Sequence, residues 1–583
     1  MKKNRLFIKL SLTTLLLSGL LGACKDEFLE IDPTGVYSEE ALTNLKGAEG
    51  MLIAAYAALD GRPETQLTGS TNWVVGSVAA DDANKGTEPS DFNSINDTEL
   101  YLQLPSAQPA SDKWLGVVDG IGMANQVLRT LVAATDISEA DRTRIEGEAR
   151  FLRGFYHMEG RKVFGTGFPW IPETAISNDD YKAITNQVEI WPQIEADLKF
   201  AYDNLPGKQA QKGRANKWAA GAFLAKAMLF QAKYPEALTI FNDVMANGTN
   251  AQGQKYALNA NYGDNFRIAT KNSTETIFAV QYTNKDGAAN NANANYENNL
   301  NFPHGSGDKP GGCCGFFQPS QAFVNSFITD AEGLPIANPL IDNGITNDRL
   351  LTSAQAFTPY TGTVDPRLDH TVGRRGIQYL DWGPHPGRDW VRDVTNGGPY
   401  SPKKNVHSRA ELAAGTAGTG DWGQPANALS FPLMRYSDLM LMAAEAEVQS
   451  GSLTNALTLV NAVRERAGSA ASVVKKPDGT PAANYKVGLY PTFASKEAAL
   501  AAILKERQLE LGMEGHRKFD LVRWGIADVV LNAYVNFEKN YIVKFVNAKF
   551  TKGQDEYQPV PQNVIQTSRT ASGTFNLKQN PGY

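Results

Sequence analysis

The sequence lacks the features that mark several large classes of protein. Its 583 residues include 3 cysteines and 6 histidines, and neither type recurs at the spacing of a metal site. After residue 23, no run reaches the roughly 18 apolar residues that a membrane-spanning helix needs. Lysine and arginine are spread along a chain of net charge −6, whereas nucleic-acid binding requires clustered cations. The sequence therefore predicts no metal, no cofactor, no spanning helix and no nucleic-acid partner.

Motifs of common enzyme classes are also missing. The chain has no G-x-S-x-G elbow, no H-E-x-x-H motif and no glycine-rich phosphate loop followed by Lys and Ser or Thr. A glycosidase needs two carboxylates at a set separation, and none of the 62 acidic residues is singled out as such a pair. Glu514 beside His516 is the best acid/base candidate. No catalytic residue is predicted, and a surface glycoside hydrolase is the weakest alternative.

The composition that remains is that of an ordinary globular protein. Hydrophobic residues make up 42% of the chain, charged residues 20% and aromatic residues 10%, so neither disorder nor a fibre is indicated. The length suffices for several domains or for one large two-lobed body with an extensive core.

The first 23 residues have the form of a bacterial export signal. A basic start is followed by a mostly apolar stretch that ends in Leu21-Gly22-Ala23-Cys24, which resembles the lipobox of lipoproteins. Cleavage there makes Cys24 the lipidated N-terminus of a linker arm that extends to residue 38. The alternative is an ordinary signal peptide with an incidental cysteine. We expect a mature protein that is anchored to a membrane by lipid.

The other two cysteines, Cys313 and Cys314, are adjacent in the sequence. Neighbouring Cα atoms lie about 3.8 Å apart, below the roughly 4.4 to 6.8 Å usual for a disulfide, so a bridge between them is strained. An oxidising compartment nevertheless permits one. A vicinal disulfide and two free thiols are equal alternatives.

Two segments repeat one another and indicate a helical array. Glu236–Val244 and Asn455–Val463 agree in Ala, Leu, Thr, Asn and Val, and their apolar residues fall at i, i+3, i+4 and i+7, the spacing of one helix face. The predicted core positions are Ala237, Ile240, Phe241, Val244, Ala456, Leu459, Val460 and Val463. Paired helices of this kind resemble degenerate tetratricopeptide repeats, which usually serve as scaffolds. The predicted fold is mainly α, with a tetratricopeptide-like scaffold.

The helical pattern fades between the two copies. Residues 251–430 form long stretches rich in Gly, Asn and Pro, with one predicted strand at Thr276–Tyr282. Long loops in a compact protein are usually functional or disordered, and their aromatic content argues against disorder. The predicted division is 1–23 signal peptide, 24–38 linker arm, 39–250 N-terminal helical region with a loop insertion at 61–109, 251–430 loop-rich, mixed α/β ligand-binding lobe, and 431–583 C-terminal helical region.

The loops contain the residue types that a sugar site uses. A sugar ring has hydroxyl groups around its edge and a C–H patch on its face, so a site for it combines aromatic rings with hydrogen-bonding side chains. The candidate ligand-binding residues are Trp73, Phe316, Phe317, Tyr379, Trp382, Arg388, Trp390 and Trp422. For each ring, the alternative is a place in the small core of its own loop.

The stretch Glu506–Gly525 alternates apolar residues with charges. Gly512 and Gly515 are expected to end one helix, and a second is expected to begin at about His516. The spacing predicts that Arg507 pairs with Glu510 and Arg517 with Asp520. The favoured interpretation is a structural ion-pair network between helices, and the alternative is a catalytic pair of Glu514 and His516.

An ordered set of motifs resembles the SusD/RagB family over nearly the whole chain. The resembling residues are the lipobox at Cys24, Glu148-Ala149-Arg150-Phe151-Leu152-Arg153, Phe164-Gly165, Gly213-Arg214-Ala215, Glu275-Thr276-Ile277-Phe278, Asp365-Pro366-Arg367, Arg435-Tyr436, Ala444-Glu445-Ala446, Arg464-Glu465-Arg466-Ala467-Gly468, Glu514-Gly515-His516-Arg517, Asp520-Leu521, Arg523-Trp524 and the final Gln579-Asn580-Pro581-Gly582-Tyr583.

The resemblance implies an outer-membrane lipoprotein that faces the exterior and captures nutrients, mostly glycans. It implies that the protein covers a partner TonB-dependent transporter of the SusC type. Some relatives capture peptides, so peptide capture by the same scaffold is the alternative. Ligand-binding residues are not shared across the family, so the candidates above rest on the chemistry of the loops alone.

Overall fold

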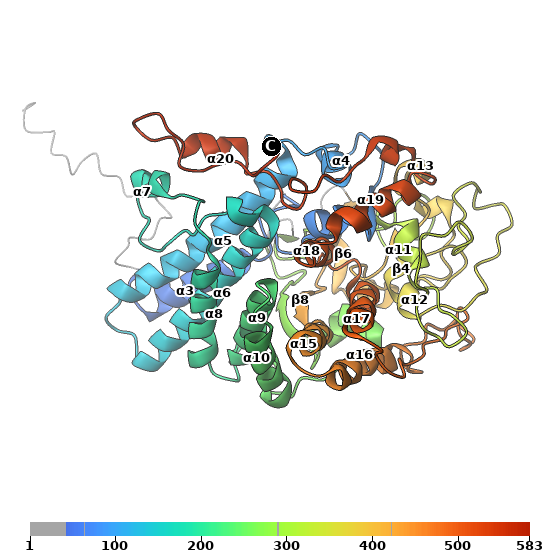
Figure 1. The fold of residues 1–583 in the computed structure, drawn as a ribbon, viewed down its shortest axis with the longest axis horizontal. Helices are drawn as coiled ribbons and strands as arrows, with labels where there is room; N and C mark the ends of the chain where they lie inside the picture. The colour runs from blue at the N-terminus through green and yellow to red at the C-terminus, as the bar shows by residue number, and fades with distance from the viewer. Residues whose placement is uncertain (1–41, 63–64, 289–290, 421–422) are drawn as a thin grey trace, which may run out of the picture.

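Long helices form the frame of the molecule (Figure 1). The computed structural model describes residues 42–62, 65–288, 291–420 and 423–583. The longer helices are α3 (Leu45–Ala57), α5 (Gln108–Ala133), α6 (Glu139–Phe164), α8 (Trp191–Asn204), α9 (Lys217–Phe230), α10 (Tyr234–Asn247), α15 (Tyr436–Ser450), α16 (Leu453–Ala467), α17 (Lys496–Leu511) and α19 (Ala527–Glu538). In Figure 1, α3, α5, α6, α8, α9 and α10 occupy the left and lower centre, and the loop-rich lobe lies at the right.

The scaffold helices pack one after another. Helix α5 lies against α6, α6 against α8, α8 against α9, and α9 against α10; α10 then packs against α15, which contacts α16 and α17. Ser138, Asn216 and Ser495 precede α6, α9 and α17, and each accepts a hydrogen bond from the backbone N–H three residues later. Side-chain caps of this kind satisfy helix ends and explain where these helices begin.

The two repeated segments are the second helices of neighbouring hairpins, α9–α10 and α15–α16. Six of the predicted core positions are buried, namely Ala237, Phe241, Val244, Ala456, Val460 and Val463, and Ile240 and Leu459 are half-buried. Lys226 of α9 and Asp438 of α15 form a buried ion pair of 3.1 Å between the hairpins. The predicted mainly α class is confirmed, and the stacking of hairpins agrees with the predicted tetratricopeptide-like scaffold.

Strands are few and short in the described chain. They are β1 (Ala83–Gly86), β2 (Thr276–Val280), β3 (Phe316–Pro319), β4 (Val372–Gly373), β5 (Ser401–Pro402), β6 (Ala417–Thr419), β7 (Pro425–Asn427) and β8 (Phe431–Arg435). They pair antiparallel as β1–β3, β2–β8, β4–β5 and β6–β7. The predicted strand at Thr276–Tyr282 is β2, which pairs from Thr276 opposite Arg435 to Val280 opposite Phe431. Because β8 leads directly into α15, this pair joins the lobe to the scaffold.

The remaining elements are single turns and short helices. They are η2 (Trp73–Val78), α4 (Ser94–Glu99), η3 (Gly165–Gly167), α7 (Asn178–Ala183), η4 (Tyr262–Phe266), η5 (Ile268–Thr270), α11 (Gln321–Asn325), α12 (Arg367–Thr371), η7 (Arg388–Trp390), α13 (Val394–Gly397), α14 (Arg409–Ala413), α18 (Arg517–Arg523), η9 (Val543–Asn547) and α20 (Gln562–Thr567). Most of the region between α10 and α15 consists of loops, as the sequence predicts.

The main hydrophobic core extends from the scaffold into the lobe. The ring of Phe278 in β2 packs edge-on against Phe151 of α6, at 4.9 Å between centroids, and also contacts Phe223 of α9. Edge-to-face aromatic pairs of this kind add to the energy of burial. The position of β2 beside the scaffold is therefore fixed by packing. Among the described residues, none of the helices combines the length and apolar character needed to cross a membrane.

Candidate functional site

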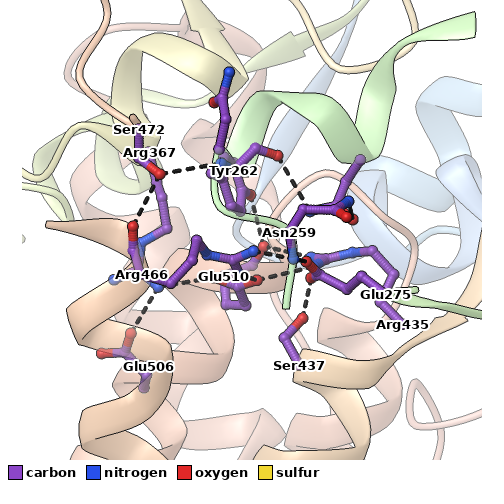
Figure 2. A network of polar contacts seen from close by, with 12 residues as sticks. Asn259, Tyr262, Glu275, Arg367, Arg435, Ser437, Arg466, Ser472, Glu506 and Glu510 are labelled. Atoms are coloured by element: carbon purple, nitrogen blue, oxygen red, sulfur yellow. Dashed lines mark hydrogen bonds and ion pairs between the residues drawn. The ribbon is translucent and has the colours of Figure 1, made fainter. Parts of the chain in front are cut away.

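The C-terminal stretch is part of a buried ion-pair network (Figure 2). Arg435, at the end of β8, donates hydrogen bonds of 2.8 Å to Glu275 and Glu510 and of 2.8 and 2.9 Å to Glu514. The carboxylates of Glu275, Asp365, Glu506, Glu510 and Glu514 are matched in number by the cations of Arg367, Lys404, Arg435, Arg464 and Arg466. All of these residues are buried. The favoured interpretation of this stretch, a structural network, is confirmed.

The partners within the network differ from those predicted by helix spacing. Arg507 pairs with Asp438 at 2.7 Å and with Asp520 at 2.8 Å, and not with Glu510. Arg517 pairs with Asp81 at 2.7 Å, and not with Asp520. Both arginines pair with residues that are distant in the sequence and not with the neighbour on the same helix face. They are largely buried, and a buried charge needs close, well-oriented counterions.

Glu514 and His516, the suggested catalytic pair, lie among the buried charges of the ion-pair network. Glu514 accepts hydrogen bonds from Arg435 and, at 2.7 Å, from Lys404. Burial tends to raise the pKa of Glu514, but Arg435 and Lys404 hold this pKa below its usual value. Burial lowers the pKa of His516 to about 4. At neutral pH the carboxylate is therefore ionised and bound by two cations, and the imidazole is uncharged, so neither group is poised to transfer a proton.

Five of the predicted sugar-binding residues lie in cores. Trp73 is 2% exposed and packs edge-on against Phe316 and Phe317, at 6.1 and 5.6 Å between centroids. Tyr379 and Trp390 are buried together, at 5.4 Å between centroids, in a small separate core of the lobe. These five rings have no exposed face to offer a ligand. The alternative stated for each ring, a place in a loop's core, describes Tyr379 and Trp390.

The structure leaves Trp382 and Arg388 at the surface of the lobe. Trp382 is half-buried, and its indole N–H donates to the carbonyl of His407 at 3.1 Å. The guanidinium of Arg409 lies 4.5 Å from the Trp382 ring and pairs with Asp308 at 2.6 Å. Arg388 is exposed. We call the set of Trp382, Arg409 and Asp308 the Trp382 surface.

The remaining candidates are placed as follows. Cys313 and Cys314 are joined by a disulfide, with Cys314 buried and Cys313 half-buried. Trp422 and Cys24 lie outside the described residues. Within the described chain, no group of three or more His, Cys, Asp or Glu side chains is arranged to hold a metal ion.

A groove beside α3 is a different candidate site. It comprises a cavity of about 580 Å³ and an adjoining cavity of about 250 Å³, which share Tyr56, Ala57 and Gln281. We call the two cavities the α3–β2 groove. In the larger cavity the apolar lining includes Ala54, Tyr56, Ala57, Ala58, Met123 and Val280, and the polar lining includes Asp60, Arg62, Asp119, Gln281, Thr283 and Asn293. A mainly apolar hollow of this size with a few polar groups is typical of ligand sites.

Two glycines allow the loop around residue 68 to pack closely against α3 and α5 beside the groove. Gly61, just after α3, has a φ of +85°, and a Cβ there would lie 2.5 Å from the backbone nitrogen of Gly69. In α5, a Cβ on Gly116 would lie 1.8 Å from the carbonyl oxygen of Thr68. Side chains at either position would push the loop around residue 68 away from the helices. The glycines therefore bring α3, α5 and this loop together at the groove.

The polar groups of the groove are held by neighbours. The Tyr56 hydroxyl donates to Glu148 at 2.7 Å and accepts from the backbone N–H of Ala215 at 2.9 Å. Gln281 exchanges two hydrogen bonds with Asn272, of 2.8 and 3.0 Å. Side chains fixed before a ligand arrives lose little conformational entropy on binding. The groove is therefore preorganised.

A carboxyl group that lines the groove faces a buried hydroxyl. The Oδ1 atom of Asp60 and the hydroxyl of Tyr282 are both buried, they lie beside one another, and neither has another hydrogen-bond partner. Burial, and then the nearby Glu297 carboxylate, raise the pKa of Asp60 well above its usual value. Burial likewise raises the pKa of Glu297 to about 7. Buried polar atoms are normally paired, so Oδ1 of Asp60 is assigned to Tyr282, and the carboxyl offers its other oxygen to the groove that Asp60 lines.

Glu297→Gln is expected to stabilise the protein at alkaline pH. A carboxyl whose pKa rises from 4.5 to about 7 on folding disfavours folding increasingly as pH rises through that interval. The free energy of unfolding of the variant should exceed that of the parent by about 3 kcal/mol at pH 8.5, at 1.36 kcal/mol per pKa unit. The difference should vanish at pH 4.

Urea denaturation at several pH values measures this difference. Glu465→Gln, which changes an exposed carboxylate on α16, is the matched control and should show no such pH-dependent gain. An equal or lower stability of Glu297→Gln at pH 8.5 would show that the Glu297 carboxylate is well compensated in the folded protein.

Sequence reasoning missed the α3–β2 groove. None of the described residues that line it is among the predicted candidates, because alanine, methionine and scattered polar residues carry no distinctive signal. The available hint was the run Ala54-Ala55-Tyr56-Ala57-Ala58 followed by Asp60-Gly61-Arg62, in which small residues at a helix end leave space beside charged ones. The apposition of this run with Gln281 depends on the β2–scaffold contact, which no local pattern reveals.

Comparison with known proteins shows similarity over almost the whole chain. Residues 274–583 match the family model described as "SusD family", and residues 50–229 match one described as "Starch-binding associating with outer membrane". A SusD-like protein of Bacteroides ovatus is 23% identical over 566 residues, covering 92% of this chain and 87% of the relative. A SusD-like protein of Formosa agariphila is 23% identical over 88% of this chain and 89% of its own length.

Solved structures share the fold. A laminarin-binding SusD-like protein superposes with a TM-score of 0.66 at 24% identity, covering 93% of this chain and all of the other. A SusD homologue from Bacteroides thetaiotaomicron gives a TM-score of 0.69 at 19% identity, over 94% and 99% of the two chains. Surface glycan-binding protein A from the same species, in complex with laminarihexaose, gives 0.61 at 18% identity, over 92% and 99%.

Proposed function

The chain belongs to the SusD family, and from this membership we propose that it captures glycans at the cell surface and delivers them to a SusC-type TonB-dependent transporter in the outer membrane. Two of its structural neighbours are named for glycan ligands, laminarin in one case and laminarihexaose in the other. In this role the protein binds its ligand without cleaving it.

The observation that supports the proposal best is the α3–β2 groove. An apolar floor of alanine and methionine suits the C–H face of a sugar, and the fixed polar groups at its walls suit the hydroxyls. The carboxyl of Asp60, which lines the larger cavity, supplies an acceptor for a sugar hydroxyl. Two adjoining cavities of about 580 and 250 Å³ have room for more than one sugar unit.

Two observations support the proposed location at the outer membrane. The lipobox ending at Cys24 would anchor the chain by lipid, and one matching family model is described as associating with the outer membrane. Mass spectrometry of the mature N-terminus should find an acylated Cys24.

Copurification from detergent-solubilised outer membranes should recover a TonB-dependent transporter, and its absence would count against the delivery role.

Calorimetric titration of the purified protein tests glycan capture. The panel comprises laminarin, starch, xylan, mannan, oligogalacturonate and mixed peptides, with chromatography of each glycan after incubation. Heat with one glycan class and no shortened product is the expected result. Heat from peptides alone would favour peptide capture, and shortened product would favour a hydrolase.

The Trp382 surface is the alternative place for the glycan. Its half-exposed indole, with Arg409 stacked on the ring and Asp308 beside it, combines an aromatic ring with hydrogen-bonding groups. Arg388 stays a predicted contributor. In its favour is the aromatic ring; against it, the guanidinium of Arg409 already covers part of that ring. We place the principal site in the α3–β2 groove for this reason.

A further inference from the structure

Among the described residues, the charged side chains that line the α3–β2 groove include no free cation. Arg62 is the cation of the larger cavity, and its guanidinium binds Asp119 through two hydrogen bonds of 2.5 and 2.9 Å. This paired, fork-like geometry occupies two of the guanidinium's donors and neutralises its charge. An anionic ligand arriving in the groove would have to compete with Asp119 for Arg62.

Cations near the groove are also engaged. Arg214, which lines the smaller cavity, pairs with Glu49 at 2.9 Å and with Glu148 at 3.2 Å. The ammonium of Lys271 donates to the carbonyls of Tyr282 and Ala428. Lys212 is exposed, but it lines a shallow neighbouring hollow and neither cavity of the groove.

A polar group of the groove that pairs with no described cation is instead a carboxyl. Asp60 lines the larger cavity close to the buried carboxyl of Glu297; burial and Glu297 raise the pKa of Asp60, and burial raises the pKa of Glu297. As a carboxylate, Asp60 accepts a hydrogen bond; as a carboxylic acid, it donates one. A sugar hydroxyl can do both, so it fits either state.

We propose that the α3–β2 groove selects uncharged glycans over uronate-containing or sulfated ones, and that Asp60 binds a hydroxyl of the sugar. This inference rests on the proposed function. A uronate or sulfate group would lose its hydration in the groove with no free cation among the described lining residues to offset that cost, and an ionised Asp60 would repel it. A neutral sugar meets a hydrogen-bonding partner and an apolar floor at no such cost.

Titration with charge-matched pairs of glycans tests the selectivity. The parent protein is titrated with laminarin, starch, xylan and mannan on one side, and with oligogalacturonate and sulfated galactan on the other. At least one uncharged glycan should bind, with an affinity at least tenfold above that of every anionic one. Asp60→Ala should lower the affinity for the uncharged glycan tenfold or more, with an unchanged melting temperature confirming the fold.

A second variant tests the role assigned to Arg62. Asp119→Asn removes its counterion, so the affinity for oligogalacturonate should rise at least tenfold. The control is Asp203→Asn, which frees the exposed Lys199 on α8, paired at 2.7 Å, and should leave oligogalacturonate binding unchanged. An equal gain in both variants would mean a nonspecific charge effect and would overturn the assignment.

The outcomes separate this inference from the proposed function. If an anionic glycan binds best and filling the groove abolishes that binding, the groove is a glycan site and its selectivity for uncharged sugars is refuted. If an uncharged glycan binds but Asp60→Ala leaves its affinity unchanged, the role of Asp60 is refuted. If no glycan binds, the proposed function falls together with the inference.

Discussion

Replacing Ala57 by tryptophan is expected to reduce glycan affinity at least a hundredfold. Ala57 is exposed on the last turn of α3 and lines both cavities of the α3–β2 groove. An indole in its place fills the space that a sugar would occupy, and a ligand excluded by bulk loses its contacts together. Because the side chain starts at the surface, the helix loses only a few tenths of a kcal/mol in propensity.

Isothermal titration with the glycan identified for the parent protein measures the effect. Ala501→Trp, at an exposed position of α17, is the matched control and should bind as the parent does. Trp382→Ala should change the affinity less than threefold. Undiminished binding by Ala57→Trp, together with lost binding by Trp382→Ala, would move the site to the Trp382 surface.

Arg435→Met is expected to lower the free energy of unfolding by about 3–5 kcal/mol, the range for removing one partner from a buried ion pair. Methionine fills most of the same volume, so the loss comes from charge. The network of Figure 2 balances its carboxylates and cations, and without Arg435 one buried negative charge is uncompensated. Glu510 is affected most. Burial alone would raise its pKa, but Arg466, Arg435 and Arg367 hold that pKa well below the usual value.

Urea denaturation followed by circular dichroism checks this value. Lys199→Met removes one partner of an exposed pair with Asp203 and should change the stability by less than about 0.5 kcal/mol. If Arg435→Met does not fold, Arg435→Lys keeps the charge but not the fork of donors and should fold with an intermediate stability. A loss below 1 kcal/mol in Arg435→Met would show that the network does not hold the lobe to the scaffold.

Helices and strand β2 could be predicted because their signals are local. The i, i+3, i+4, i+7 pattern of α10 and α16 reports which face is buried whatever lies opposite. The run Thr276–Tyr282, rich in β-branched and aromatic residues, likewise indicates a strand, and β2 is buried from Ile277 to Val280. The similarity of the two hairpins also predicts that they belong to one array, and α10 indeed packs against α15.

Ion-pair partners could not be predicted from spacing. Arg517 has Asp520 three residues away, yet it binds Asp81, which is more than 400 residues away in the sequence. The nearby residue was a reasonable expectation for an exposed helix, where such pairs form. Burial changes the outcome, because a desolvated guanidinium is stable only where several oxygens surround it.

The candidate site shows the same limit. An aromatic residue in a long loop is equally suited to binding a sugar and to filling the loop's interior, and only the tertiary structure distinguishes Trp390, which is buried, from Trp382, which is partly exposed. The α3–β2 groove arises from the absence of large side chains at Ala54, Ala57 and Ala58 opposite β2. An absence of bulk has no sequence signature.

A crystal structure of the protein with its glycan tests the α3–β2 groove most directly. Crystals are soaked with the oligosaccharide that gives heat in the titration, or with laminarihexaose if it is a β-glucan. The sugar is expected between α3 and β2, with a hydroxyl within hydrogen-bond distance of Asp60 and with Gln281 beside it. A sugar bound at the Trp382 surface, with the groove empty, would contradict the site proposed here.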